Sequence, residues 1–554
     1  MTDSGTMKKR ILFFVFLLAS LNLFSNANQR PKLVVCLVVD QMRWDNLHRY
    51  AHRYSSRGFN RLLQEGFACE NTMINYIPTF TAVGHASLYT GTVPAIHGVV
   101  GNEFTVQRTG EMVYVLDDPK VQGVGQYGFL PEGRAAKSPF RIESTTITDE
   151  LRMSTEFRSK VISVALKDRA SVLPGGHNPT AAYWFDSSTA EWVSSSWYMS
   201  ELPKWVKKFN EKRYPQKYLS RRWKLEYPLK SYLHYGLNAI AYERSLKGMD
   251  VEFPFDFSPL VKEKGAGIIT HTPYGNDLTL DFAKSAIAYE QLGQGEYTDF
   301  LAVSLSSTDY MGHLFGPNSL KMEDAYIKLD RRIGEFIDYL DSQLGRENYL
   351  FVLTADHGAI HNGTYLKENK LPGANWDESE ERGKLNGFLK ESLGSDQLVI
   401  NLYNYQVNYN YAKIKELGVE QEELNELVLG YLREQPAIGF ALRSREIETY
   451  PLPNWIRTRM RNGYHPAICG EIQVILKPGY YSSSRSQGAS HGTWHPDDAQ
   501  IPLVWLGWKI PNGRTYQEVE ITDVAVTLAA LLQIQRPNGA IGRPILPLME
   551  QIKP

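Results

Sequence analysis

The sequence predicts an α/β protein built on one mostly parallel β-sheet, with helices covering both faces and long segments inserted between its elements. Five apolar, β-branched runs are spread over almost the whole chain, and four of them have amphipathic helical stretches nearby. Continuous apolar strands that alternate with helices are typical of buried parallel sheets. The five predicted strands are 32–39, 160–166, 299–306, 348–354 and 501–507.

The chain begins with a predicted secretory signal peptide, residues 1–27, whose first six residues form a short upstream extension. Lys8-Lys9-Arg10 precedes the apolar run ILFFVFLLASL, and Ser25-Asn26-Ala27 supplies the small residues of a cleavage site. The run is too short to span a bilayer, and a buried helix is the alternative interpretation. We expect cleavage after Ala27, export to the periplasm, and no membrane span in the mature protein.

Residues 28–554 are predicted to form a single domain with two inserted cap segments. Residues 182–262 are rich in Trp, Tyr and Lys, and residues 362–480 are polar and mixed in character. We expect both segments to lie over the sheet, where such folds place specificity. A predicted amphipathic helix covers 325–345, and a late helix covers 522–534.

The composition narrows the possible classes of protein. Hydrophobic residues make up 43% and charged residues 22% of the chain, as in ordinary folded proteins. The formal net charge of −1 gives no support for specific nucleic-acid binding. Three cysteines, Cys36, Cys69 and Cys469, are too few for a disulfide scaffold and form no CxxC pair.

Aspartates and histidines gather where the predicted strands end, at the edge where open α/β sheets bind ligands. Any one of them is explained by turn formation. The whole set predicts a metal site, because histidine with carboxylate is the ligand set that zinc prefers. The candidate ligands are Asp40, Asp309, His313, Asp356, His357 and His491, with His495 as a competitor of His491.

The stretch IPTFTAVGH places two hydroxyls, Thr79 and Thr81, directly before a predicted helix. One interpretation is a strand–turn–helix junction in which a threonine caps the helix. The other is that one hydroxyl is a nucleophile at a helix N-terminus, where backbone N–H groups favour anions.

In this order and context the motifs resemble the alkaline phosphatase superfamily, and the resemblance covers nearly the whole mature chain. It implies an α/β/α sandwich, a cofactor of two zinc ions, and a nucleophile at Thr81, which precedes Ala82-Val83-Gly84-His85; Thr79 becomes a turn or supporting residue. The implied ligands are Asp309, His313 and His491 for one zinc and Asp40, Asp356, His357 and Thr81 for the other.

The stretch ALKDRASVLPGGH is similar to one in the periplasmic, phosphate-irrepressible alkaline phosphatases that use a threonine nucleophile. The similarity implies that Lys167, Arg169 and Asn102 bind phosphoryl oxygens. Lys167 and Arg169 stand two residues apart after a strand, so in an extended chain both reach the same side; two solvated charges are the simpler interpretation. Extra cationic donors favour a phosphate monoester, which carries one more negative charge than a diester.

The sequence therefore predicts an exported two-zinc hydrolase of phosphate monoesters that works through a phosphothreonine intermediate, as a monomer without nucleic-acid-specific binding. Two alternatives remain open. One is a nucleotide pyrophosphatase/phosphodiesterase of the same fold, and the other is a non-catalytic exported binding protein.

Overall fold

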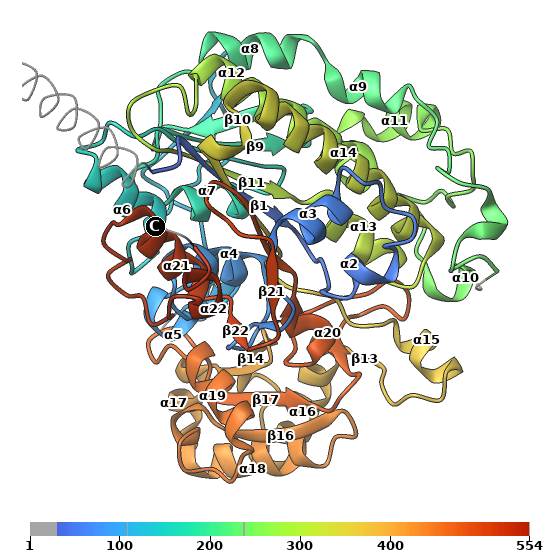
Figure 1. Cartoon of the computed structure of the whole chain (residues 1–554). Helices are drawn as coiled ribbons and strands as arrows, with labels where there is room; N and C mark the ends of the chain where they lie inside the picture. Colours follow the sequence, from blue (N-terminus) through green and yellow to red (C-terminus); the bar gives the residue numbers. More distant parts are fainter. Residues whose placement is uncertain (1–29, 108, 237–238, 553–554) are drawn as a thin grey trace, which may run out of the picture.

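The computed structural model describes residues 30–107, 109–236 and 239–552. The predicted signal peptide lies outside the described residues. The core is an eleven-stranded sheet that contains all five predicted strands. Figure 1 labels β1 and β11 at its centre. Across the sheet, the strands are β21 (Gly513–Thr515), β2 (Phe67–Cys69), β20 (Leu503–Gly507), β12 (Tyr349–Thr354), β1 (Leu33–Val39), β11 (Asp299–Leu305), β8 (Val161–Ala165), β9 (Ala181–Asp186), β10 (Glu191–Ser195), β6 (Gly123–Gly125) and β7 (Gly128–Phe129).

The centre of the sheet is parallel. Strand β1 pairs in parallel with β11 on one side and β12 on the other, and β11 pairs in parallel with β8. All seven residues of β1 are buried, which explains why its sequence, LVVCLVV, shows no polar alternation. Because these neighbours run in one direction, their carboxyl ends meet at the same edge of the sheet. Antiparallel strands, β20 and β10, flank this parallel centre.

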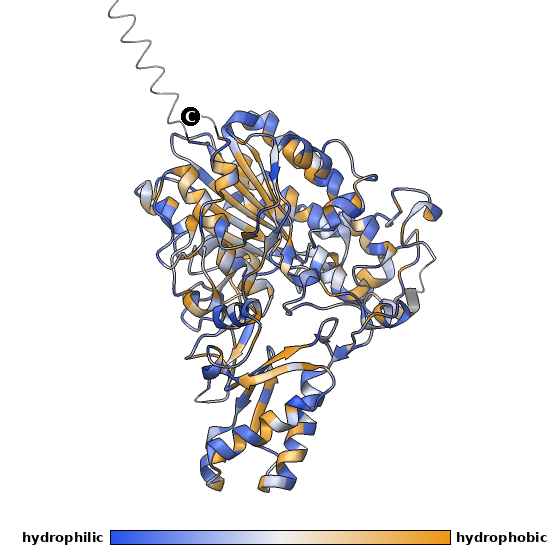
Figure 2. Ribbon diagram, turned by 60° about the horizontal axis from the view of Figure 1, so that its bottom comes forward, coloured by the Kyte–Doolittle hydropathy of each residue, from blue (hydrophilic) through white to orange (hydrophobic). Residues whose placement is uncertain are grey.

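Two helical layers cover the sheet and make an α/β/α sandwich, as predicted. The helices of each layer pack against one another on either side of the strands (Figure 1). Figure 2 shows the apolar strands enclosed by helices whose outward faces are hydrophilic. One layer contains α4 (Thr81–Thr90), α6 (Ile147–Ser154), α7 (Arg169–Gly175) and α21 (Asp523–Leu532); the other contains α3 (Phe59–Glu65), α12 (Pro273–Glu290), α13 (Ser307–Phe315) and α14 (Leu320–Leu344).

The first predicted cap segment begins too early in the sequence. Residues 182–195 belong to β9 and β10 of the central sheet, because their aromatic residues are core residues: Trp192 stacks on Phe282 of α12 with ring centroids 4.1 Å apart. The part outside the sheet starts after Ser195. It forms the short helices α8 (Lys204–Glu211), α9 (Tyr214–Leu219), α10 (Ala239–Tyr242) and α11 (Ser258–Lys264).

Residues 375–482, which we name the second lobe, have a small sheet and a hydrophobic core of their own. The lobe projects below the sandwich in Figure 1. The chain enters through β13 (Asn375–Trp376) and leaves through β18 (Tyr481–Ser482), which pair with each other. The sheet contains β14 (Val399–Tyr403), β15 (Gln406–Tyr409), β17 (Ile472–Leu476) and β16 (Ile438–Arg443), covered by α16 (Glu378–Leu393), α17 (Tyr411–Leu417), α18 (Gln421–Arg433) and α19 (Asn454–Gly463).

A hairpin of β4 (Glu103–Thr105) and β5 (Met112–Tyr114) lies between the sandwich and the second lobe. In the described part of the chain, no helix combines the length and apolar character needed to cross a membrane. The remaining short α-helices and strands are α2 (Asn46–Arg49), β3 (Thr72–Met73), α5 (Pro94–His97), α15 (Gly363–Glu368), α20 (Pro496–Ala499), β19 (Gln500–Ile501), β22 (Val519–Glu520) and α22 (Leu546–Met549).

Candidate active site

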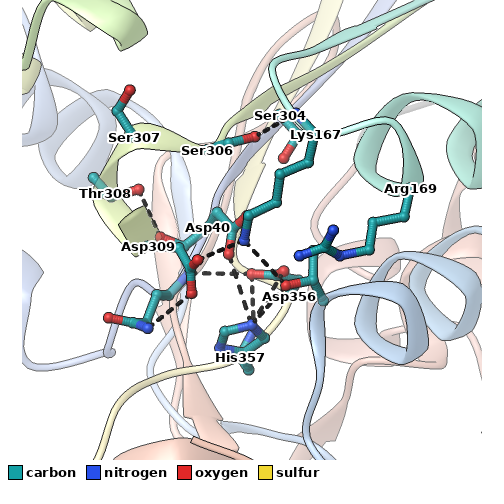
Figure 3. Close-up of polar contacts among 12 residues, drawn as sticks. Asp40, Lys167, Arg169, Ser304, Ser306, Ser307, Thr308, Asp309, Asp356 and His357 are labelled. Carbon is teal, nitrogen blue, oxygen red and sulfur yellow. Dashed lines mark hydrogen bonds and ion pairs between the residues drawn. The ribbon is translucent and has the colours of Figure 1, made fainter. Parts of the chain in front are cut away.

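Three buried carboxylates meet at the carboxyl edge of the parallel strands. Asp40 directly follows β1, Asp356 follows β12, and Asp309 lies in the first turn of α13, just after β11. The buried Lys167 lies between two of them: its Nζ is 2.8 Å from Asp40 Oδ2 and 2.6 Å from Asp309 Oδ2 (Figure 3). The parallel register therefore brings together acidic groups that are far apart in the sequence.

Thr81 faces this cluster and Thr79 does not. Thr81 is the first residue of α4, and its hydroxyl oxygen lies 3.3 Å from His357 Nε2 and 3.2 Å from Lys167 Nζ. The hydroxyl of Thr79 instead donates to the carbonyl oxygen of Thr493 and accepts from the backbone N–H of Gly492. Neither threonine caps the helix, because Phe80 occupies the N-cap position.

Five of the candidate ligands form two groups of three that share Asp309. Within each group, the donor atoms all lie within 4.8 Å of one another. One contains Asp309, His313 and His491, the three residues that the resemblance assigns to one zinc ion. The other contains Asp40, Asp309 and His357, so Asp309 is close to both positions. The predicted ligand Asp356 adjoins the second group, with its Oδ2 3.5 Å from His357 Nε2.

Backbone carbonyl groups fix the orientation of all three histidines. The Nδ1 atoms of His313, His357 and His491 donate to the carbonyl oxygens of Ala489, Gly358 and Thr79, over 2.9, 2.9 and 2.7 Å. This leaves each Nε2, which lies 3.3 to 3.6 Å from a carboxylate oxygen, as the free ligand atom.

His495 is outside both groups. It is the N-cap residue of α20, where its Nδ1 accepts a hydrogen bond from the backbone N–H of Asp497. The sequence leaves the choice between His491 and His495 open. In the structure His491 lies within the cluster, and His495 caps a helix outside it.

The electrostatics of the cluster call for additional positive charge. Burial raises the pKa of Asp40 well above its usual value, and the nearby Asp356 raises it further; burial also raises the pKa of Asp356 to about 7. Burial also favours a raised pKa for Asp309, but the nearby His313 and Lys167 outweigh this effect and hold the pKa of that carboxyl well below its usual range.

The residues fit the binding of divalent cations. Asp40 Oδ1 and Asp356 Oδ2 are buried and have no hydrogen-bond partner, a costly state that a bound cation relieves. Burial lowers the pKa of His357 to about 4 and, with help from His357, also lowers the pKa of His491. Both imidazoles are therefore neutral, as ligation requires.

The predicted phosphate-binding residues approach the cluster from the helical layer that contains α4 and α7. Asn102 accepts a hydrogen bond from the backbone N–H of Ala82, which ties it to the start of α4. Arg169 is the first residue of α7 and extends toward the cluster (Figure 3). Its Nε is buried without a hydrogen-bond partner. Lys167 and Arg169 reach the same region, but they do so from the start of α7 and not from the extended chain that their spacing predicts.

Comparisons with known proteins agree with this geometry. The family model for type I phosphodiesterase / nucleotide pyrophosphatase matches residues 34–498. The chain is 42% identical to alkaline phosphatase PafA of Elizabethkingia meningoseptica, over 94% of this chain and 95% of that one. The chain belongs to the alkaline phosphatase superfamily.

Other relatives of this superfamily member extend the comparison. A protein of Myroides odoratus named a calcium-transporting ATPase is 46% identical, over 96% of each chain. A crystal structure of wild-type alkaline phosphatase PafA superposes with a TM-score of 0.90 at 40% identity and covers 94% of this chain and 99% of that one. Murine ectonucleotide pyrophosphatase / phosphodiesterase 5, with a TM-score of 0.52 at 12% identity, shares the fold.

Sequence reasoning missed Gln41, which contacts Asp309, the residue shared by both ligand groups, and Asp356, which adjoins the second group. Its backbone N–H donates to Asp356 Oδ1 over 3.2 Å, and its Nε2 donates to Asp309 Oδ1 over 2.8 Å. Its backbone has a φ of 65°, unusual for a residue other than glycine. A Cβ atom on Gly312 would lie 1.8 Å from Gln41 Oε1, so this glycine provides the space for the side chain. The only signal in the sequence is its position after Asp40.

Proposed function

We propose that this enzyme is an exported two-zinc hydrolase of phosphate monoesters that acts as a monomer through a phosphothreonine intermediate. The observation that carries the proposal is the position of the Thr81 hydroxyl, at a helix N-terminus and beside both Lys167 and His357. Relatives named alkaline phosphatases support phosphate monoesters as the substrate class.

Asp309, His313 and His491 would hold one zinc ion, and Asp40, Asp356, His357 and Thr81 would hold the other. When bound, zinc supplies positive charge for the phosphoryl oxygens and lowers the pKa of a coordinated hydroxyl. Zinc suits this site because its donors are imidazole nitrogens and carboxylate oxygens.

The residues of the chain position the reacting atoms. The Thr81 hydroxyl gives its proton to solvent water, and its Oγ forms a bond to phosphorus while the ester P–O bond breaks. The departing alkoxide takes a proton from water, so the alcohol leaves with no net change in protons. Water then displaces Thr81 from the phosphothreonine and releases inorganic phosphate. Lys167 donates a hydrogen bond to Thr81 Oγ, which favours the alkoxide form of the nucleophile. Asn102, Lys167 and Arg169 would bind the non-bridging oxygens, and the positive charges of Lys167 and Arg169 favour a dianion.

The same-fold alternative is a nucleotide pyrophosphatase/phosphodiesterase, and it is favoured by the description of the matching family model. A comparison of kcat/KM for a phosphate monoester and a diester on zinc-loaded protein tests the proposal. We expect the monoester to be hydrolysed with the higher kcat/KM; preference for the diester would favour the alternative. Bound zinc with release of phosphate from p-nitrophenyl phosphate would exclude a non-catalytic binding protein.

A further inference from the structure

A tight turn of the second lobe packs against the segments that carry predicted active-site residues. Strands β14 and β15 are joined by Asn404 and Tyr405, whose φ angles are 55° and 61°. Two-residue hairpin turns of this kind favour Asn-Gly, because the second residue also needs a positive φ. A tyrosine in this conformation is strained, and such strain persists where the surroundings hold the residue in place. Unlike most hairpin turns, this one is buried, with 8% of Asn404 and 4% of Tyr405 exposed.

Asn404 packs against the chain on both sides of Asn102. Its Nδ2 donates to the carbonyl oxygen of Glu103 over 2.8 Å. A Cβ atom on Gly101 would lie only 2.4 Å from the same Nδ2, so the backbone and the amide are in direct contact. Tyr403, the residue before the turn, donates to the Glu103 carboxylate over 3.1 Å.

Tyr405 packs behind the nucleophile and one candidate zinc ligand. Its ring stacks on Phe80, which directly precedes Thr81, with an interplanar angle of 11°. A Cβ atom on Gly492, which directly follows His491, would lie 3.0 Å from Tyr405 Cε2 and 2.6 Å from Phe80 Cε1. The hydroxyl of Tyr405 lies 3.4 Å from the His491 carbonyl oxygen.

The second lobe holds the turn firmly. The backbone N–H of Tyr405 donates to Glu378 Oε1 over 2.8 Å, and its ring stacks on Trp376 on the side of the lobe. Both partners lie where the chain enters the lobe, next to the sandwich.

We propose that the Asn404–Tyr405 turn is a positioning element that sets the place of Asn102 through Asn404, and of Thr81 and His491 through Tyr405. The role of the second lobe in this reaction is then to support the turn. The inference rests on the proposed function, since it assigns phosphate binding to Asn102.

The decisive variant is Asn404→Gly, because glycine accepts the positive φ and only the side-chain contacts are lost. We expect the Kd of inorganic phosphate, measured by calorimetry on zinc-loaded protein, to rise about five- to tenfold, the size expected for one lost hydrogen bond. In an Asn102→Ala background the same substitution should add nothing, because the turn acts through Asn102. Zinc content should remain that of the wild type.

The matched control is Asn386→Ala, which removes two hydrogen bonds to the backbone of Val399 inside the lobe and touches no residue near Asn102. We expect a lower Tm and an unchanged phosphate Kd. An unchanged Kd in Asn404→Gly, equal losses in the control, or an additive loss in the Asn102→Ala background would overturn the inference. Phosphate binding is measured without turnover, so the two proposals can fail separately. A protein whose phosphate Kd depends on the turn but which hydrolyses no monoester would refute the proposed function and leave this inference standing.

Discussion

The two halves of the site are built in different ways. The metal-ligand half, which contains the six predicted Asp and His ligands, stands largely on the ends of β1, β11 and β12, whose spacing is fixed by a parallel hydrogen-bonded register. The phosphate half, Thr81, Asn102, Lys167 and Arg169, stands on helix starts and on the chain beside a hairpin. That hairpin is supported by the second lobe.

The difference shows which part of the site the sheet determines. The register alone places the carboxylates at one edge, whereas the phosphate half depends on contacts between segments hundreds of residues apart in the sequence. Lys167 belongs to both halves, because its ammonium contacts Asp40, Asp309 and Thr81. Substitutions in each half should therefore give distinct losses, of metal in one and of phosphate recognition in the other.

The largest expected effect lies at Thr81, where the two halves meet. Thr81→Ala should lower monoesterase kcat/KM by at least about three orders of magnitude, because the covalent route is lost. Thr81→Ser should retain much of the activity, since a primary hydroxyl can still attack. Thr79→Ala serves as the control and should cost far less, because its hydroxyl only holds the segment after His491. The reverse ranking of the two alanine variants would refute the assignment of the nucleophile.

Lys167 and Arg169 should separate the substrate classes. If each charge-assisted contact contributes about 2–4 kcal/mol in the transition state, removing both should cost several orders of magnitude on a monoester. The loss should be smaller on a diester, which has less charge on its non-bridging oxygens. Measuring kcat/KM for both substrates on the single and double alanine variants, with zinc content verified, tests this. Equal losses on both substrates would favour the phosphodiesterase alternative.

The metal-ligand half is tested by zinc content. A chelator should abolish activity and added Zn²⁺ should restore it, while His491→Ala should weaken loading at the position shared with Asp309 and His313. His495→Ala is the matched control and should leave loading nearly intact, because His495 caps α20 outside the cluster. Full zinc occupancy in the His491 variant would transfer the ligand role elsewhere.

The sequence predicts the sheet and the grouping of the candidate ligands, because buried parallel strands have an apolar signature and their polar ends share an edge. It failed where tertiary packing decides. The sequence predicts a cap for the aromatic stretch after Ala181, yet this stretch forms β9 and β10, since aromatic residues suit a buried strand and a surface segment alike. The Asn404–Tyr405 turn gave no signal, because its importance depends on what lies against it. Gln41 was missed for the same reason.

The smallest expected effect concerns Gln41, which contacts two predicted ligands, Asp309 and Asp356, without being a predicted ligand itself. Gln41→Gly keeps the positive φ and the backbone hydrogen bond to Asp356 but removes the donor to Asp309. Because hydrogen bonds to metal ligands typically contribute 10- to 100-fold in affinity, we expect zinc affinity to fall by about tenfold in a competition with a chelator. Gln41→Ala should lose more, since alanine also strains the left-handed backbone.

Gly312→Ala tests the same contact from the other side. Its new Cβ would meet Gln41 Oε1 at 1.8 Å and displace the side chain, while Asp309 and His313 on the same helix stay intact. Zinc affinity should again fall, by an amount similar to that in Gln41→Gly, and combining the two substitutions should cost little more than either alone. Gly383→Ala in α16 is the control, because no atom lies within 4 Å of its Cβ position, and it should leave zinc affinity unchanged. Wild-type zinc affinity in both Gln41→Gly and Gly312→Ala would mean that the sheet register alone places the ligands and that Gln41 does not help to hold the two groups together.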